Sequence, residues 1–178
     1  MRGTPDGEFK WICHIRDHFS KYSVATPMKS KASEEVASVF LTWIIHLGVP
    51  GKVHCDNGTE FKGALELLLR KHGIKIIHGR AHHPQSQGMV EKGNDILKEK
   101  IAAWLSDHQS SSWVEAIPEA LIAMNIQRSS VTKKSPYEIV FGKRANLSFT
   151  SGLEREHMAV PEESSDDGET SSNTAGLI

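Results

Sequence analysis

His54-Cys55-Asp56-Asn57-Gly58-Thr59-Glu60-Phe61 is the stretch that decides the fold of this chain. It predicts the end of a short apolar strand, followed by a carboxylate and a turn. A second stretch, His83-Pro84-Gln85-Ser86-Gln87-Gly88-Met89-Val90-Glu91, predicts a loop that opens a helix with a carboxylate in its first turns. Two acids held at the ends of such elements can share a divalent cation, because hard cations prefer oxygen ligands.

The flanking sequence predicts alternating strands and helices from its hydrophobic periodicity. Residues 9–16 and 22–27 predict an antiparallel hairpin, preceded by a turn at Pro5-Asp6-Gly7. Ser33 is expected to cap a helix that ends at Gly48. The remaining expected elements are strands at residues 52–55 and 74–77, helices at about 65–73, 86–106 and 113–125, and a short element at 135–142. We expect Pro118 to kink or delay its helix. This order predicts a mixed α/β sheet flanked by helices.

Charge divides the chain of 178 residues into two parts. Residues 151–178 hold seven acids and one base, which leaves 20 bases and 15 acids in residues 1–150. We expect residues 1–150 to form one domain of net charge +5, and residues 151–178 to form an acidic disordered tail. A basic domain fits a polyanion partner, and an ordinary solvated surface explains the charge equally well. No apolar run approaches the roughly 18 residues that a membrane span requires.

Four motifs closely resemble the catalytic core of retroviral and LTR-retrotransposon integrases. They are Asp-Asn-Gly-Thr-Glu-Phe (56–61), His-Pro-Gln-Ser-Gln-Gly-Met-Val-Glu-Lys-Gly-Asn (83–94), Asp-His-Phe-Ser-Lys-Tyr (17–22) and Lys-Ser-Pro-Tyr-Glu-Ile-Val-Phe-Gly (134–142). They occur in the family's order over most of the chain. The sequence also resembles integrase-derived genes that host genomes have kept.

The resemblance implies a ribonuclease H-like fold and a catalytic site of Asp, Asp and Glu. Asp56 matches the second Asp, and Glu91 matches the Glu; 34 residues separate them, one fewer than is usual. Both are implied to bind Mg²⁺ or Mn²⁺. The implied nucleic-acid-binding residues are Asn57, His82, Gln85, Ser86, Gln87, Asn94 and Lys98. Asp95 departs from the pattern, because some relatives carry a DNA-contacting lysine there.

The first acid of the family has no match in this chain. Asp17 matches a non-catalytic position, and Asp6 is expected in a turn, where it is a poor substitute. We therefore expect the opening strand, with its Asp, to be missing. Two-metal strand transfer needs that acid to bridge both ions. With two carboxylates alone, we expect weak binding of one ion and little or no activity.

Two interpretations follow from these motifs. The first is an integrase-type polynucleotidyl transferase core that acts in DNA integration, impaired by the loss of its first acid. The second is a catalytically dead module that binds nucleic acid or another protein. Both imply DNA as a partner and a homodimer, with no membrane and no small-molecule substrate. We expect an intracellular protein, in the nucleus.

Several other residues have structural interpretations. Cys13 and Cys55 are expected to be small core residues rather than nucleophiles, and two cysteines give neither a disulfide framework nor a zinc site. His54 is expected to pack on a neighbouring strand. Trp43, Trp104 and Trp113 are expected in the core or in a dimer interface.

Overall fold

The computed structural model describes residues 2–55, 58–78 and 84–146. Its first sheet is an antiparallel meander of β1 (Arg2–Asp6), β2 (Phe9–Arg16) and β3 (Ser23–Met28). β2 and β3 pair without interruption from Trp11 opposite Met28 to Arg16 opposite Ser23. The predicted hairpin is therefore confirmed.

β1 corrects the expectation that the opening strand is missing. Residues 2–6 form a strand, and its pairing with β2 shifts register between Arg2 and Asp6. Of the predicted turn at residues 5–7, Pro5 and Asp6 belong to the strand, and the turn lies at Gly7, whose φ of 57° is readily adopted by glycine. Pro5 is tolerated because β1 is an edge strand among the described residues, where a missing N–H breaks no ladder.

Two contacts with a helix explain why β1 is ordered. Trp113 donates its indole N–H to the carbonyl of Thr4 at 2.8 Å. The Oδ2 atom of Asp6 accepts from the Ser112 hydroxyl at 2.8 Å and from the Val114 N–H at 2.9 Å. The strand is thus tied to the start of α4 (Trp113–Ile126). These contacts join residues more than 100 positions apart, which local patterning does not predict.

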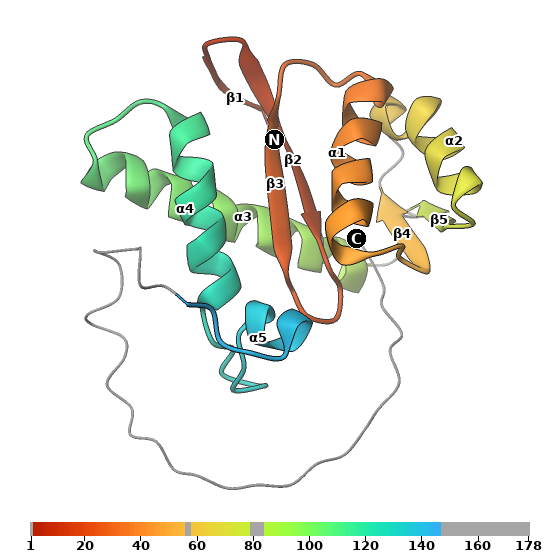
Figure 1. The fold of residues 1–178 in the computed structure, drawn as a ribbon. Helices are drawn as coiled ribbons and strands as arrows, with labels where there is room; N and C mark the ends of the chain where they lie inside the picture. The colour runs from red at the N-terminus through yellow and green to blue at the C-terminus, as the bar shows by residue number, and fades with distance from the viewer. Residues whose placement is uncertain (1, 56–57, 79–83, 147–178) are drawn as a thin grey trace, which may run out of the picture.

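The second sheet is a parallel pair of β4 (Lys52–Cys55) and β5 (Lys75–His78). Between them lie a 3₁₀ turn at Thr59–Phe61 and α2 (Ala64–Lys71). The right-hand part of Figure 1 shows α1 (Ser33–Leu47) between this pair and the meander. Both strands and α2 lie within a residue or two of their predicted bounds.

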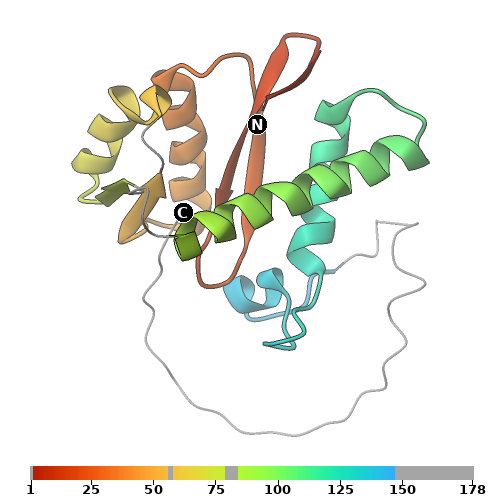
Figure 2. The same cartoon turned by 180° about the vertical axis from the view of Figure 1, so that it is seen from behind.

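Helices cover both faces of the meander, and each face has its own core. α1 covers one face, with α2 packed on α1, around Ile15, Met28, Phe40, Trp43 and Leu69. α3 (Pro84–Asp107) and α4 cover the other, and Figure 2 shows α3 crossing the sheet. The second core includes Ala25, Leu97, Ile101, Trp113 and Ile117. Because side chains alternate along a strand, β2 and β3 contribute to both cores.

The helix termini contain two differences from the predictions. Ser33 is the first residue of α1, not its cap; its hydroxyl donates to the Lys62 carbonyl and accepts from the Leu65 N–H, so it joins α1 to α2. Pro118 lies inside α4 without delaying its start. α5 (Pro136–Phe141) begins with a capping box formed by Ser135 and Glu138. No helix within the described ranges is long and apolar enough to cross a membrane.

Candidate functional site

The parallel pairing of β4 and β5 sets where the predicted carboxylates can lie. Cys55 pairs with His78, so both strands end at one edge of their sheet. Asp56 follows Cys55 directly, and α3 begins six positions after His78. Glu91 lies seven residues into α3, about 10 Å along the helix axis, and it is exposed. Asp56 and Asn57 lie outside the described residues.

A close contact between α3 and β2 fixes the helix against the meander beside Glu91. A Cβ added to the buried Gly93 would lie 2.5 Å from Nη1 of Arg16 and 3.1 Å from its Cδ. A larger residue here would require the Arg16 side chain to shift. Arg16 also donates from Nε to the Lys21 carbonyl at 3.3 Å. The guanidinium therefore lies between α3 and the turn that joins β2 to β3.

The neighbouring contact is polar and joins the same two elements. Nδ1 of His14 lies 2.8 Å from Oδ1 of Asn94, so the ring donates if its proton is on Nδ1. Burial lowers the pKa of His14, the bond to Asn94 opposes that change, and Arg16 adds to it. Nε2 of His14 is buried and has no hydrogen-bond partner among the described residues. The imidazole is therefore held neutral.

The connection between β2 and β3 brings more cations close to β4. Burial lowers the pKa of His18, with Lys21 and Lys52 adding to the effect and Asp17 opposing it. Burial, with Lys52 and His18 contributing, also lowers the pKa of His54. His18 therefore lies near both Lys21 and Lys52, and Lys52 begins β4, whereas Asp56 follows the other end of that strand. These cations make this side of the sheet suitable for an anion.

Two described acids in or beside the meander accept hydrogen bonds within the fold. Asp6 binds the start of α4, as given above. Oδ2 of Asp17 accepts from the Ser20 N–H at 2.7 Å and from the Ser20 hydroxyl at 2.6 Å. Within residues 2–55, 58–78 and 84–146, no group of three His, Cys, Asp or Glu could hold a metal ion. The expectation that neither Asp6 nor Asp17 supplies the third carboxylate stays a prediction, and Oδ1 of Asp17 has no hydrogen-bond partner among the described residues.

The predicted nucleic-acid-binding residues fall into three groups. Asn57 and His82 lie outside the described residues. Gln85, Ser86 and Gln87 belong to the first turns of α3, and the structure describes their backbone but not their side chains. Lys98 is exposed and lies 3.2 Å from Asp95, whereas Asn94 is half-buried against His14. Their assignment to nucleic acid stays a prediction.

The structural interpretations of other residues hold within the described ranges. Cys13 is packed against the first core, and burial raises the pKa of its thiol to about 11, so it is no nucleophile at neutral pH. Cys13 and Cys55 do not form a disulfide with each other. Trp43 and Trp113 are core residues, while Trp104 is half-buried and stacks on His108 at 4.1 Å. His54 pairs with Ile77 across the parallel sheet.

Arg16, His18, Lys21 and Lys52 are candidate site residues that the sequence did not single out. Three of them belong to or adjoin the motif Asp17-His18-Phe19-Ser20-Lys21-Tyr22, which could have signalled a role. Their proximity to β4 depends on how the hairpin lies across the sheet ends. No spacing rule relates residue 18 to residue 52.

This chain is similar in sequence to known proteins. The model of the integrase core domain matches residues 2–84. The human KRAB-A domain-containing protein 2 is 32% identical over 163 residues, which are 90% of this chain and 33% of that protein. The chain therefore spans about a third of that relative's length.

Solved structures extend the likeness beyond residue 84. The catalytic core domain of BIV integrase is 30% identical, with a TM-score of 0.64, and the match covers 74% of this chain and 85% of that one. The catalytic core domain of HTLV-2 integrase, solved with magnesium in a dimeric form, is 27% identical. Its TM-score is 0.60, and the match covers 72% of this chain and 83% of that one.

Proposed function

This chain belongs to the integrase core domain family, with its mixed α/β ribonuclease H-like fold, and on that premise we propose a specific role for it. It binds nucleic acid at the edge where β4 ends and α3 begins. Asp56 and Glu91 are the carboxylates of that site. Residues 1–150 form the integrase core, followed by an acidic segment at residues 151–178. The protein acts in the nucleus, where a fluorescent fusion would locate it.

The observation that carries this proposal is the position of Glu91. An exposed carboxylate on a long helix is common. This helix, however, follows β5 at the sheet edge where β4 also ends, and Asp56 directly follows β4. Arg16 packs against Gly93, two residues after Glu91, so a cation contacts the same helix on its buried side. A phosphodiester needs both: cations for its oxygens, and carboxylates to hold a metal ion beside it.

The donor set fits a hard cation. Carboxylate oxygens are the ligands that Mg²⁺ prefers, and the ion keeps several waters, so two carboxylates suffice for weak binding. We propose that Asp56 and Glu91 hold Mg²⁺ or Mn²⁺, as the magnesium complex of the HTLV-2 core supports. When bound, such an ion polarises a phosphoryl oxygen and activates a nucleophile. Arg16, Lys21 and Lys52 position the phosphates.

Strand transfer by this chain alone is weak or absent under the proposal. Two-metal chemistry needs a third carboxylate that bridges both ions. Oδ2 of Asp6 accepts from the start of α4 and Oδ2 of Asp17 accepts from Ser20, and we propose that neither carboxylate takes that role. Loss of chemistry does not imply loss of nucleic-acid binding, because the cations that contact phosphate are separate from the acids.

A second role, dimerisation, is supported by the outer face of α1. Leu41 and Ile45 lie about one turn apart there and are exposed, Ile45 by 70%, and the exposed Val49 follows the end of the helix. The opposite face of α1 fills the first core. We propose that this apolar stripe forms a homodimer contact, as the dimeric HTLV-2 core supports.

A manganese-dependent assay on a labelled branched DNA tests the proposed function, with strand transfer and disintegration as readouts. The full chain is compared with Glu91→Gln, and with Glu99→Gln as a matched control, since Glu99 is exposed on the same helix. We expect DNA binding in all three and little or no product. Product that Glu91→Gln abolishes and Glu99→Gln preserves would show an active enzyme. Absence of DNA binding in all three would refute the proposal.

A further inference from the structure

Five cations gather around α5, far in sequence from the carboxylate stretches. They are Arg128, Lys133, Lys134, Lys143 and Arg144, and all five are exposed. Between residues 128 and 144 the only acid is Glu138. We call these five residues the α5 cationic surface. Its net charge, counting Glu138, is +4 over 17 residues.

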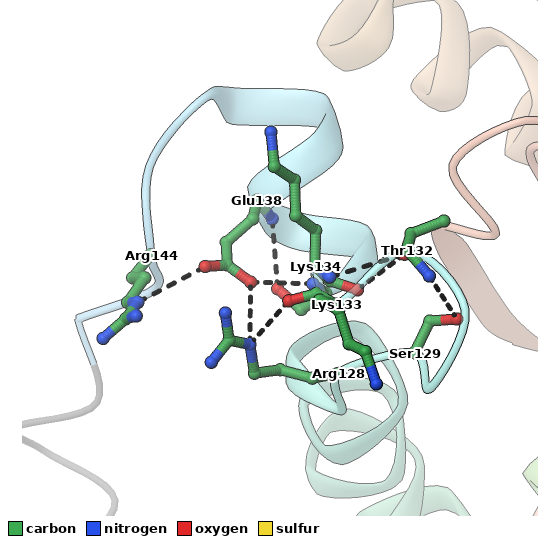
Figure 3. Close-up of polar contacts among 8 residues, drawn as sticks. Arg128, Ser129, Thr132, Lys133, Lys134, Glu138 and Arg144 are labelled. Atoms are coloured by element: carbon green, nitrogen blue, oxygen red, sulfur yellow. Dashed lines mark hydrogen bonds and ion pairs between the residues drawn. The ribbon is translucent and has the colours of Figure 1, made fainter. Parts of the chain in front are cut away.

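The segment that carries this surface has a defined structure. Figure 3 shows the connection between α4 and α5 closed by its own hydrogen bonds. The Ser129 N–H donates to the Lys134 carbonyl at 3.0 Å, and the Lys133 N–H donates to the Ser129 carbonyl at 2.9 Å. The Thr132 hydroxyl also donates to Lys134, at 3.2 Å. Because this backbone is already ordered, the entropic cost of ordering it when a ligand binds is smaller.

Glu138 organises the two arginines. Its Oε2 accepts from the Ser135 N–H at 2.7 Å, and the carboxylate lies 3.9 Å from Nε of Arg128 and 3.4 Å from Nε of Arg144 (Figure 3). The Ser135 N–H is the main cause that lowers the pKa of Glu138. Across residues 2–55, 58–78 and 84–146, no carboxylate forms an ion pair with Lys133, Lys134 or Lys143. These three lysines therefore offer charges that the fold does not use.

Aromatic contacts anchor α5 to the β2–β3 hairpin. The ring of Phe141 lies 5.6 Å from Tyr22 and 4.5 Å from Tyr137, measured between centroids. Tyr22 directly follows Lys21, which lies near His18, and His18 lies near Lys52 of β4. In Figure 1 the hairpin turn lies between α5 and β4. The α5 cationic surface is therefore linked to the carboxylate site through the hairpin.

The hairpin itself presents an aromatic ring to solvent. Phe19 is 72% exposed, between His18 and the lysine at position 21. A large exposed aromatic residue beside cations suits a nucleic acid, because every base has a face on which it can stack. Phe141 is also partly exposed, at 42%.

We propose that the α5 cationic surface, together with Phe19, binds the phosphate backbone of nucleic acid that extends from the Asp56–Glu91 edge. This inference rests on the proposed function and assigns a second contact region to it. Lys133, Lys134 and Lys143 neutralise phosphates without reading sequence. This region lies outside both carboxylate stretches. It therefore lengthens the segment of nucleic acid that is bound and adds no catalytic group.

Salt dependence of DNA binding tests this proposal in the full chain. Fluorescence anisotropy with a labelled duplex, titrated between about 50 and 200 mM salt, reports the number of phosphates neutralised. The test variant combines Lys133→Ala, Lys134→Ala and Lys143→Ala. The control variant combines Lys62→Ala, Lys71→Ala and Lys75→Ala, which are also exposed and change the net charge equally. Circular dichroism melts check that both variants fold.

The expected result is a reduction of the salt slope by about 1 to 3 in the test variant, with roughly tenfold weaker binding at low salt. The control keeps the slope and affinity of the unmodified chain. Phe19→Ala weakens binding in the same assay, and Phe19→Trp restores it.

Three results would overturn the proposal, and they differ in meaning. Equal slopes for test and control variants would show that α5 makes no phosphate contacts while leaving the carboxylate site intact. Tighter DNA binding by the test variant would show that the surface holds an acidic partner, such as residues 151–178, instead. No binding by the unmodified chain would also refute the proposed function.

Discussion

Nδ1 of His14 and Oδ1 of Asn94 lie 2.8 Å apart, so β2 and the helix that carries Glu91 are joined by a largely buried polar contact. The pair lies one helical turn from Glu91 along α3. Because Asn94 turns toward the sheet, Glu91 and Lys98 occupy exposed positions on either side of it. The contact thus helps to determine which residues of α3 face a ligand.

Stability should fall as pH drops below the ordinary pKa of histidine. Burial lowers the pKa of His14 in the folded chain, so between that value and about 6.5 the unfolded chain binds more protons. His14 therefore contributes stability above about pH 6.5 that is lost at lower pH. His18 and His54 are shifted in the same direction. Urea denaturation across this range should show a shallower pH dependence for His14→Gln; an unchanged dependence would contradict the assignment.

Gly93 and Arg16 should be coupled energetically. Alanine in a helix interior is favoured over glycine by about 1 kcal/mol, but here its Cβ would meet the Arg16 guanidinium. Gly93→Ala should therefore raise the unfolding free energy of the Arg16→Ala variant by about 1 kcal/mol. In the unmodified chain the same substitution should raise the unfolding free energy by less, or not at all. A double-mutant cycle by chemical denaturation measures this difference. Equal effects in both backgrounds would show that the guanidinium moves away freely.

Asp6 should act as a structural acid. Its carboxylate accepts two hydrogen bonds at the start of α4, so Asp6→Ala should cost about 1–2 kcal/mol of unfolding free energy. The same substitution should leave the affinity for Mn²⁺ unchanged. Thermal melts and a metal titration on the same sample separate the two roles. A loss of metal affinity without a loss of stability would make Asp6 a ligand.

Ile45 should control self-association. Its side chain is 70% exposed within the apolar stripe of α1, so Ile45→Lys should change a dimer into a monomer without unfolding it. Sedimentation velocity gives the oligomeric state, and Lys71→Ala supplies a control on α2. A monomeric unmodified chain, or a variant that remains dimeric, would show that the stripe is not the contact.

The elements that the sequence predicted well are those with local signals. The strand at 52–55 matches β4, and the long helix begins at Pro84, two residues before its predicted start. Their apolar periodicity and turn residues lie within a few positions of each other. The family motifs likewise predicted the ribonuclease H-like fold.

The features that could not be predicted depend on contacts distant in sequence. β1 is ordered by Trp113 and Ser112, and Ser33 is drawn away from capping by Lys62 and Leu65. Asn94 was assigned to a ligand from its helical spacing after Glu91. Its contact with His14, 80 residues away, could be found only once β2 and α3 were placed together.

Binding of Mn²⁺ followed by electron paramagnetic resonance tests the central claim most directly, because it needs neither DNA nor turnover. The unmodified chain is compared with Asp56→Asn, Glu91→Gln and the control Glu99→Gln. We predict weak binding of one ion, lost in Asp56→Asn and in Glu91→Gln and retained in Glu99→Gln. Binding that survives both Asp56→Asn and Glu91→Gln, or no binding by the unmodified chain, would contradict the proposed carboxylate site.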